Sequence, residues 1–152
     1  MTLAVFLAVV MAAAVLSGQF AGGDWYRSMQ QPAWNPSAAV MAMVWPLLYL
    51  LMALSAWMVW EKGRQSARTA LAWWVAQLLS GICWSWIYFG QGRIGWALGV
   101  MTLWLLLALI MTNAFRYISR TGAWLCLPLV AWMIFSWYLN LIQWHLNGGG
   151  SG

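Results

Sequence analysis

The sequence predicts an all-α integral membrane protein, built as a bundle of five transmembrane helices. Of its 152 residues, 64% are hydrophobic and only 6% are charged, whereas a soluble domain carries about 25% charged residues. The chain also contains five apolar stretches, each long enough to cross the roughly 30 Å hydrocarbon core of a bilayer. A transmembrane β-barrel would need strands of about ten residues with alternating polarity, and this chain lacks that alternation.

We expect the five helices at about residues 2–22, 38–60, 69–89, 95–115 and 123–146, within a single domain of residues 1–147. The first stretch has no Lys or Arg ahead of its apolar run, so we interpret it as a retained helix rather than a secretory signal peptide. Residues 148–152 resemble an artificial glycine–serine linker and are left out of the fold prediction.

The segment between the first two predicted helices, residues 24–37, is rich in aromatic residues and proline. Pro32 and Pro36 each lack a backbone N–H donor and hold the preceding residue in an extended conformation. A regular helix therefore cannot contain both of them. We predict an extramembrane loop that closes as a lid over the mouth of the bundle.

The distribution of basic residues predicts the orientation in the membrane. The N-terminus, the 61–68 loop and the 116–122 loop are expected on one side, and Arg27 and Arg93 on the other. Because basic residues concentrate on the cytoplasmic side, we predict a cytoplasmic N-terminus and an external lid, in a bacterial cell membrane. The basic residues form no continuous patch, so nucleic acid is not an expected partner. The five on the N-terminal side are Lys62, Arg64, Arg68, Arg116 and Arg120.

Three of the predicted helices carry a stripe of large aromatic and uncharged polar residues at helical spacing. An unpaired amide is costly in lipid, so we expect these stripes to face inward around a common cavity. Packing between helices would explain the same tryptophans without a ligand, and the spacing alone does not separate the two interpretations. The stripes are Trp45, Tyr49, Met52 and Ala56; Trp73, Gln77, Ser80 or Gly81, Trp84 and Tyr88; and Pro128, Trp132, Ser136, Asn140 and Gln143.

A series of motifs runs through about residues 20–145. These are Trp25-Tyr26, Gln31-Pro32-x-Trp34-x-Pro36, Val44-Trp45, Leu48-Tyr49, Gln77-Leu78, Trp84, Tyr88-Phe89-Gly90, Gly95-Trp96-Ala97-Leu98, Pro128, Ala131-Trp132 and Leu139-Asn140. Their identity and order resemble the TspO/MBR family, which contains the tryptophan-rich sensory proteins and the translocator proteins, or peripheral-type benzodiazepine receptors.

The resemblance implies a five-helix bundle that binds flat hydrophobic ligands beneath its first loop. Members of the family bind porphyrins and, in some cases, sterols, and they are often homodimers. No cofactor is required for such a function, and porphyrin or haem is the expected ligand of this chain. The ligand-binding residues that we predict from the family motifs and the stripes are Trp34, Trp45, Tyr49, Gln77, Trp84, Trp96, Trp132 and Asn140.

The chain departs from the family pattern at two places. Family members commonly carry Asn four positions after the residue that matches Gln77, and this chain has Gly81 there. One pocket amide is therefore missing, which leaves the ligand specificity open. In the last helix, Tyr138 is not followed by Lys or Arg, so the sterol-associated pattern of the animal proteins is absent.

We therefore expect a membrane receptor or carrier for tetrapyrroles with a sensory or regulatory role. The alternative is a small-molecule transporter or permease, although no predicted helix contains a charged residue of the kind that coupled transporters place at membrane depth. A packed bundle without a ligand is a third interpretation. The bilayer, the tetrapyrrole and a second copy of the chain are the expected partners.

Enzymatic chemistry has little support in the sequence. The only carboxylates, Asp24 and Glu61, are predicted on opposite sides of the membrane. Cys83, Cys126 and His145 are not placed at metal-ligand spacing. We therefore expect neither hydrolytic nor metal-dependent activity. The family resemblance implies at most a slow, light-dependent breakdown of bound porphyrin, involving Trp45 and Trp132.

Overall fold

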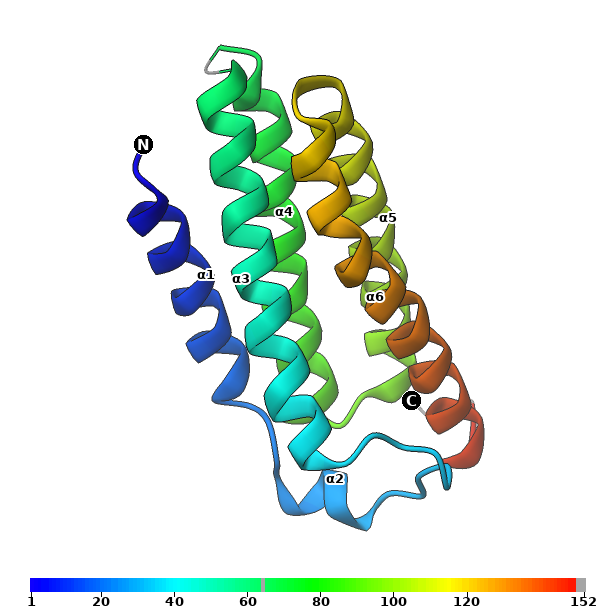
Figure 1. The fold of residues 1–152 in the computed structure, drawn as a ribbon. Coiled ribbons are helices and arrows are strands. Elements are labelled where there is room, and N and C mark those ends of the chain that lie inside the picture. The colour runs from blue at the N-terminus through cyan, green and yellow to red at the C-terminus, as the bar shows by residue number, and fades with distance from the viewer. Residues whose placement is uncertain (64, 150–152) are drawn as a thin grey trace.

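The computed structural model describes residues 1–63 and 65–149. They form a bundle of helices (Figure 1), and no strand occurs among them. The predicted all-α membrane bundle of five helices is confirmed. The elements are α1 (Leu3–Gly18), α2 (Asp24–Ser28), α3 (Ala38–Gly63), α4 (Ala67–Ser85), the π-helix η1 (Trp86–Gly90), α5 (Ile94–Ile118) and α6 (Arg120–Leu146).

Four helical segments are long and apolar enough to cross a membrane: α3, α4 with η1, α5 and α6. The helix at the N-terminus is shorter than predicted, because α1 ends at Gly18 after 16 residues. At 1.5 Å per residue it is about 24 Å long, less than the hydrocarbon thickness. The residues that follow form turns, and Gly22 takes a positive φ of 87° that few other residues adopt.

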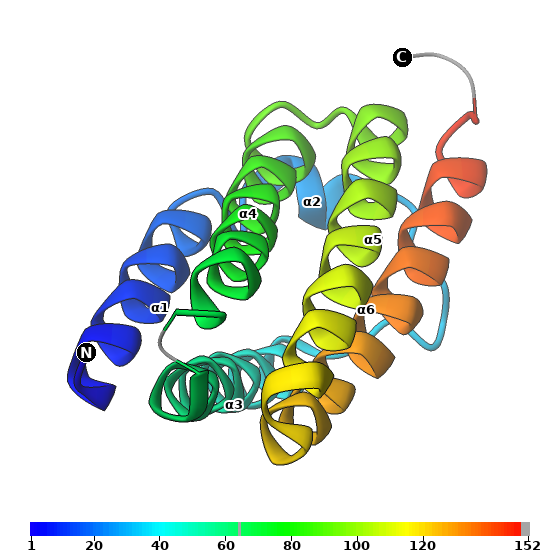
Figure 2. The same ribbon diagram turned by 90° about the horizontal axis from the view of Figure 1, so that it is seen from above.

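The four long segments surround a common interior, and α1 packs on the outside against α3 and α4 (Figure 2). Helix α5 lies between α4 and α6, and α6 closes the ring by packing against α3. Phe6 of α1 is buried, and its ring meets the ring of Trp74 edge-on at 5.7 Å. The first helix is therefore part of the bundle.

The third predicted helix continues through α4 into η1 and ends at Gly90. The sequence did not predict the change to π-helical geometry. It also placed Trp73 on the inward stripe, and this was wrong. Trp74 is the buried residue of the pair, with 3% exposure against 37% for Trp73, because Trp73 lies at the edge of the buried face while Trp74 is nearer its centre.

The connection between α5 and α6 consists of Ser119 alone, and not of the longer 116–122 loop that we expected. The Ser119 hydroxyl accepts a hydrogen bond from the backbone N–H of Gly122, so it caps the start of α6. This connection, the N-terminus and the α3–α4 loop lie at one end of the bundle (Figure 1), as predicted. Arg64, one of the basic residues counted on this side, lies outside the described residues.

The segment 24–37 crosses the opposite end of the bundle (Figure 1). It is not a loop throughout, because its first residues form α2. The prolines lie in the irregular part that follows, and α3 begins at Ala38. We call residues 24–37 the lid. Of the proposed linker, Gly150–Gly152 lie outside the described residues.

Candidate ligand-binding site

A cavity of about 660 Å³ lies beneath the lid, between α3, the α4–η1 segment and α6. Its volume is within the range of small-molecule sites in proteins. Six residues of the lid contribute to its lining, so the lid forms one wall. The lining residues are Ala21, Gly22, Tyr26, Arg27, Gln31, Asn35, Pro36, Ser37, Ala38, Met41, Trp45, Trp84, Tyr88, Phe89, Ser136, Leu139, Asn140 and Gln143.

One side of this lid cavity is aromatic. Trp84 stacks on Tyr88 with the ring centroids 4.9 Å apart, and it meets Phe89 edge-on at 5.6 Å. The second large wall residue, Trp45, lies parallel to Trp104 at 5.9 Å, and Trp104 also contacts Trp84 at 6.0 Å. Trp104 thus supports both tryptophans from behind, which holds two indole rings at the cavity wall.

A chain of hydrogen bonds holds the lid over the cavity. The hydroxyl of Tyr88 donates to Gln143 Oε1, and Gln143 Nε2 donates to Asn35 Oδ1 in the lid over 3.2 Å. Asn35 Nδ2 in turn donates to Gln31 Oε1 at 2.7 Å, and Gln31 Nε2 donates to the backbone carbonyl of Tyr26. This chain connects the lid to both η1 and α6.

A second connection joins the lid to the end of α6 outside the cavity. Asn147 Oδ1 accepts a hydrogen bond from the backbone N–H of Gln30 over 2.9 Å, and Asn147 Nδ2 donates to the carbonyl oxygen of Gln30 over 2.8 Å. One side chain thereby pairs with both polar backbone groups of a lid residue. We call this pair of bonds the Asn147 clamp.

Asn140 is a buried amide in the wall of the lid cavity. Its Oδ1 accepts a hydrogen bond from Trp84 Nε1 over 3.1 Å, and its Nδ2 donates to the backbone carbonyl of Ile94 over 3.3 Å. It therefore links α4, α5 and α6 at one point and fixes the orientation of the Trp84 indole. An amide buried among apolar helices needs such partners.

Gln77 and Gly81 support the site from behind its wall. Gln77 is fully buried; its Oε1 accepts from Trp104 Nε1 over 2.9 Å, and its Nε2 donates to the sulfur of Met52. A Cβ atom on Gly81 would lie only 2.6 Å from the Trp104 ring. The missing amide at position 81 thus has a physical reason in this chain, because the Trp104 ring takes the space.

An adjoining cavity of about 510 Å³ lies between α1, α3 and α4. Its lining is mostly apolar, with Ser17, Tyr49 and Ser85 as the residues that carry hydroxyl groups. The two cavities share part of their walls, so the apolar lining is continuous from the lid to the flank of α1. The shared residues are Ala21, Met41, Trp45, Trp84 and Phe89.

The structure brings only part of the predicted site together. Trp45, Trp84 and Asn140 line the lid cavity, and Tyr49 lines the adjoining one. Gln77 lies behind the wall, where it holds Trp104. Of the two tryptophans that the family resemblance connects with light-dependent chemistry, Trp45 lines both cavities, and Trp132 is among the lining residues of neither.

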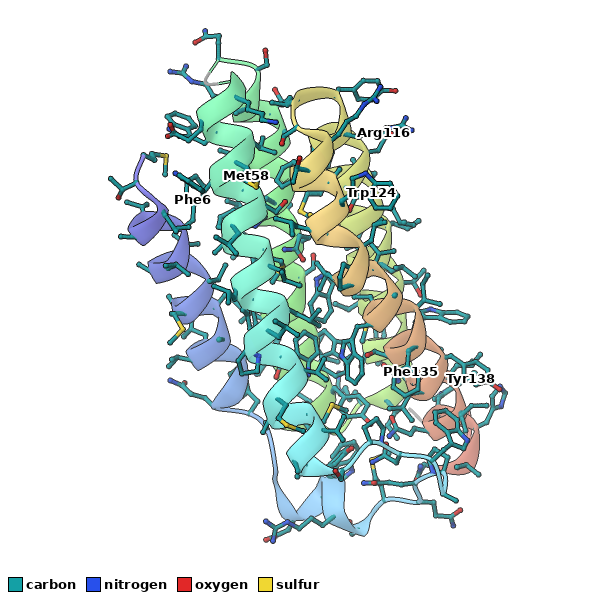
Figure 3. All side chains as sticks on the ribbon, in the orientation of Figure 1. Phe6, Met58, Arg116, Trp124, Phe135 and Tyr138 are labelled. Atoms are coloured by element: carbon teal, nitrogen blue, oxygen red, sulfur yellow. The ribbon has the colours of Figure 1, made fainter. Side chains whose placement is uncertain are left out.

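The other predicted tryptophans lie elsewhere. Trp34 is 46% exposed and stacks on Tyr138 of α6 at 5.8 Å, on the half of α6 that is nearer the lid (Figure 3). Trp132 packs against Phe135, with 5.3 Å between the ring centroids. Trp96 is 65% exposed and borders a separate depression near the end of α6. Trp34 therefore packs the lid against α6, Trp132 packs against the core of the bundle, and none of the three lines the lid cavity.

Several residues of the cavity were missed by the site prediction. Tyr26, Arg27, Gln31 and Asn35 all come from the lid. Helical spacing does not extend through this proline-containing segment, so it could not predict which side chains face inward. Phe89 faces the cavity from the π-helix. A signal for Gln31 and Asn35 was present, because the amides on either side of Pro32-Ala33-Trp34 can form a hydrogen bond with each other.

The site has no cluster of metal-ligating residues. Among the described residues, no three His, Cys, Asp or Glu side chains come together as they would around a metal ion.

Comparison with known proteins agrees with this architecture. The chain is 33% identical over 134 residues to the translocator protein of Homo sapiens, covering 86% of this chain and 79% of that protein. It is 33% identical over 143 residues to the tryptophan-rich sensory protein of Cereibacter sphaeroides, covering 93% and 89%. It is also 30% identical over 138 residues to the translocator protein of Bos taurus, covering 87% and 82%. The sequence model of the TspO/MBR family matches residues 4–145, and the chain therefore belongs to this family of integral membrane proteins.

Proposed function

We propose that this protein is a membrane receptor or carrier that binds a tetrapyrrole, porphyrin or haem, in the lid cavity. The observation that supports this most strongly is the cavity itself, because it lies beneath the lid and has two indole walls held in place by Trp104. A flat macrocycle gains from offset stacking on such rings. The relative named tryptophan-rich sensory protein supports a sensory role for the bound state.

The geometry changes which tryptophans should contact the ligand. Of the five tryptophans among the predicted ligand-binding residues, only Trp45 and Trp84 line the lid cavity. We therefore place the macrocycle against Trp45 and Trp84. Trp132 serves as a packing residue in this proposal, and its indole N–H lies buried without a hydrogen-bond partner.

A titration of the purified protein with porphyrin, followed by quenching of tryptophan fluorescence, tests the proposal. Trp45→Phe and Trp84→Phe should each weaken affinity about two- to tenfold, because Phe keeps a ring but gives up part of the stacking surface. Trp132→Phe and Trp60→Phe are controls that should bind as the parent does. Equal binding by all four variants would show that the indoles of the cavity do not hold the ligand.

Transport of such a ligand is the second candidate function. One observation favours it: the lid cavity and the adjoining cavity share a wall, so an apolar route leads from beneath the lid toward the flank of α1. Uptake of porphyrin into proteoliposomes would distinguish the two functions. A receptor should bind without uptake, whereas a transporter should accumulate porphyrin inside the vesicles.

We also propose that the protein forms a homodimer in which α5 contributes to the interface. The sequence Gly95-x-x-x-Gly99 at the start of α5 has the spacing that allows close helix approach. Gly95 is not available for this, because Trp144 occupies the space next to it. Gly99 is exposed and has no side chain within 4 Å of its Cβ position, so a second helix can approach closely there. Gly99→Leu should reduce cross-linking between copies, and Gly18→Leu, an equally open position on α1, should not. Unchanged cross-linking with Gly99→Leu would exclude this part of α5 from the interface.

A further inference from the structure

The lid cavity has an uneven distribution of polar groups. The lid contributes Arg27, Gln31, Asn35 and Ser37, and α6 adds the uncharged polar residues Ser136, Asn140 and Gln143, while α3, α4 and η1 contribute large apolar and aromatic residues such as Trp45 and Trp84. A ligand that fills the cavity would therefore meet indole faces on the α3 and α4 walls and polar groups at the lid and α6, with the only charge at the lid. This pattern points to an amphipathic ligand with one polar edge.

The cavity lining carries positive charge only. Arg27 is the only charged residue among those that line the cavity. The whole chain has two carboxylate side chains, Asp24 and Glu61, and neither belongs to the lining. The cavity mouth thus presents one cation without an acidic residue beside it in the wall. A guanidinium at such a place is suited to a carboxylate, to which it can donate two parallel hydrogen bonds.

The helix that carries Arg27 is held in position by its neighbours. Tyr26 meets Phe89 edge-on at 5.2 Å and lies 6.1 Å from Tyr88. Trp25 meets Tyr88 edge-on at 5.8 Å and fills the space beside Gly92. The two residues before Arg27 therefore fix α2 against η1. As a result, the backbone of Arg27 is held in a defined position at the cavity mouth.

We propose that Arg27 selects ligands with an acidic edge: it pairs with a carboxylate of the bound tetrapyrrole and turns that edge toward the lid. The ring body then lies against Trp45 and Trp84, and the acidic substituents stay near water. This inference rests on the proposed function, and it assigns Arg27 a role beyond its contribution to membrane orientation. The ligand class that it specifies is a tetrapyrrole with free carboxylates on one side.

Two forms of one porphyrin distinguish the contribution of the carboxylates to the affinity from that of the ring. The probes are a dicarboxylate porphyrin and its dimethyl ester, titrated into the full chain in nanodiscs of zwitterionic lipid. The parent should bind the diacid more tightly than the diester. Arg27→Gln should weaken diacid binding by about three- to tenfold. This loss of affinity lies between that expected for an exposed ion pair and that expected for a charge-assisted hydrogen bond. The same variant should bind the diester as the parent does.

Two further variants serve as controls. Arg27→Lys keeps the charge but loses the paired geometry, so it should retain part of the preference for the diacid. Arg93→Gln removes the other basic residue predicted on the same side of the membrane, which borders a different depression, and it should bind both probes as the parent does. Because salt screens exposed charges, raising its concentration should reduce the preference of the parent for the diacid over the diester. The same change should leave the relative affinities of Arg27→Gln for the two probes unchanged.

The possible failures are distinguishable. If the parent binds neither probe, the proposed function fails and the role of Arg27 fails with it. If the parent binds both probes equally and Arg27→Gln changes nothing, tetrapyrrole binding stands but the acid-selecting role of Arg27 is wrong. If Arg93→Gln weakens diacid binding as much as Arg27→Gln, the effect comes from general surface charge, which also overturns the assignment.

Discussion

At the scale of single residues, the site depends on how closely Trp104 fits between its neighbours. Its indole N–H is paired with Gln77, its face lies parallel to Trp45, and its edge is next to Gly81. The ring cannot move away from position 81 without losing at least one of these contacts. Gly81 is therefore required by packing.

This fit predicts the effect of a single added methyl group. Gly81→Ala should lower the free energy of unfolding by about 1–3 kcal/mol, because its Cβ would overlap the Trp104 ring. The gain in helix propensity of up to about 1 kcal/mol offsets only part of this cost. Gly18→Ala, whose Cβ would meet nothing within 4 Å, should be neutral or slightly stabilising. Thermal unfolding in detergent measures both, and a Gly81→Ala protein as stable as Gly18→Ala would contradict the packing argument.

The sequence identified some site residues and missed others for a physical reason. Trp45, Trp84 and Asn140 lie on helices, where spacing along one face predicts which residues meet. Trp34 lies in the lid, where no periodicity exists, and its ring turned out to pack on the outside of α6. Arg27 was read as an orientation signal because its place at the cavity mouth depends on how α2 packs against η1.

At the scale of secondary-structure elements, we expect the lid to open when a ligand enters the lid cavity. It is attached to the bundle by the hydrogen-bond chain through Asn35 and by the Asn147 clamp. The clamp lies outside the cavity, so it can be removed without changing the surface that contacts the ligand. It is therefore the better place to test how firmly the lid is closed.

Asn147→Ala should loosen the lid. Each lost hydrogen bond contributes about 0.5–1.5 kcal/mol, so hydrogen exchange at the Gln30 amide and across the irregular part of the lid should become about tenfold faster. The control is Asn113→Ala, at the opposite end of the bundle, where the side chain accepts a hydrogen bond from Arg116. Unchanged exchange in the lid of Asn147→Ala would mean that other contacts hold it closed.

Hydropathy predicted the presence and order of the helices, but it did not predict all of their ends. A run of apolar residues shows where a span can lie, and the actual ends depend on local geometry. At Ser119 a single capping residue replaced an expected loop, and at Trp86–Gly90 the helix widened into π-helical geometry. In the first span, α1 stopped at Gly18 although the sequence stayed uncharged up to Asp24.

At the scale of the whole molecule, the structure places the lid and the α3–α4 loop at opposite ends of the bundle (Figure 1). Which end faces the cytoplasm stays a prediction from the basic residues. In a background without the two native cysteines, Ser37→Cys should react with an impermeant thiol reagent added outside intact cells, and Ser66→Cys should not. Both residues are exposed at the protein surface. Labelling of Ser66→Cys alone would reverse the orientation.

The central claim is that a tetrapyrrole occupies the lid cavity, and filling that cavity tests it most directly. Ser136 lines the cavity from α6, so Ser136→Phe should place a ring in the space that the ligand needs. Ala131 is exposed on the same helix and is not part of the lining, which makes Ala131→Phe the matched control. The measurement is the porphyrin dissociation constant of each variant in the same nanodiscs. We predict that Ser136→Phe weakens binding by at least about tenfold and that Ala131→Phe binds as the parent does; equal affinity of Ser136→Phe and the parent would contradict the claim.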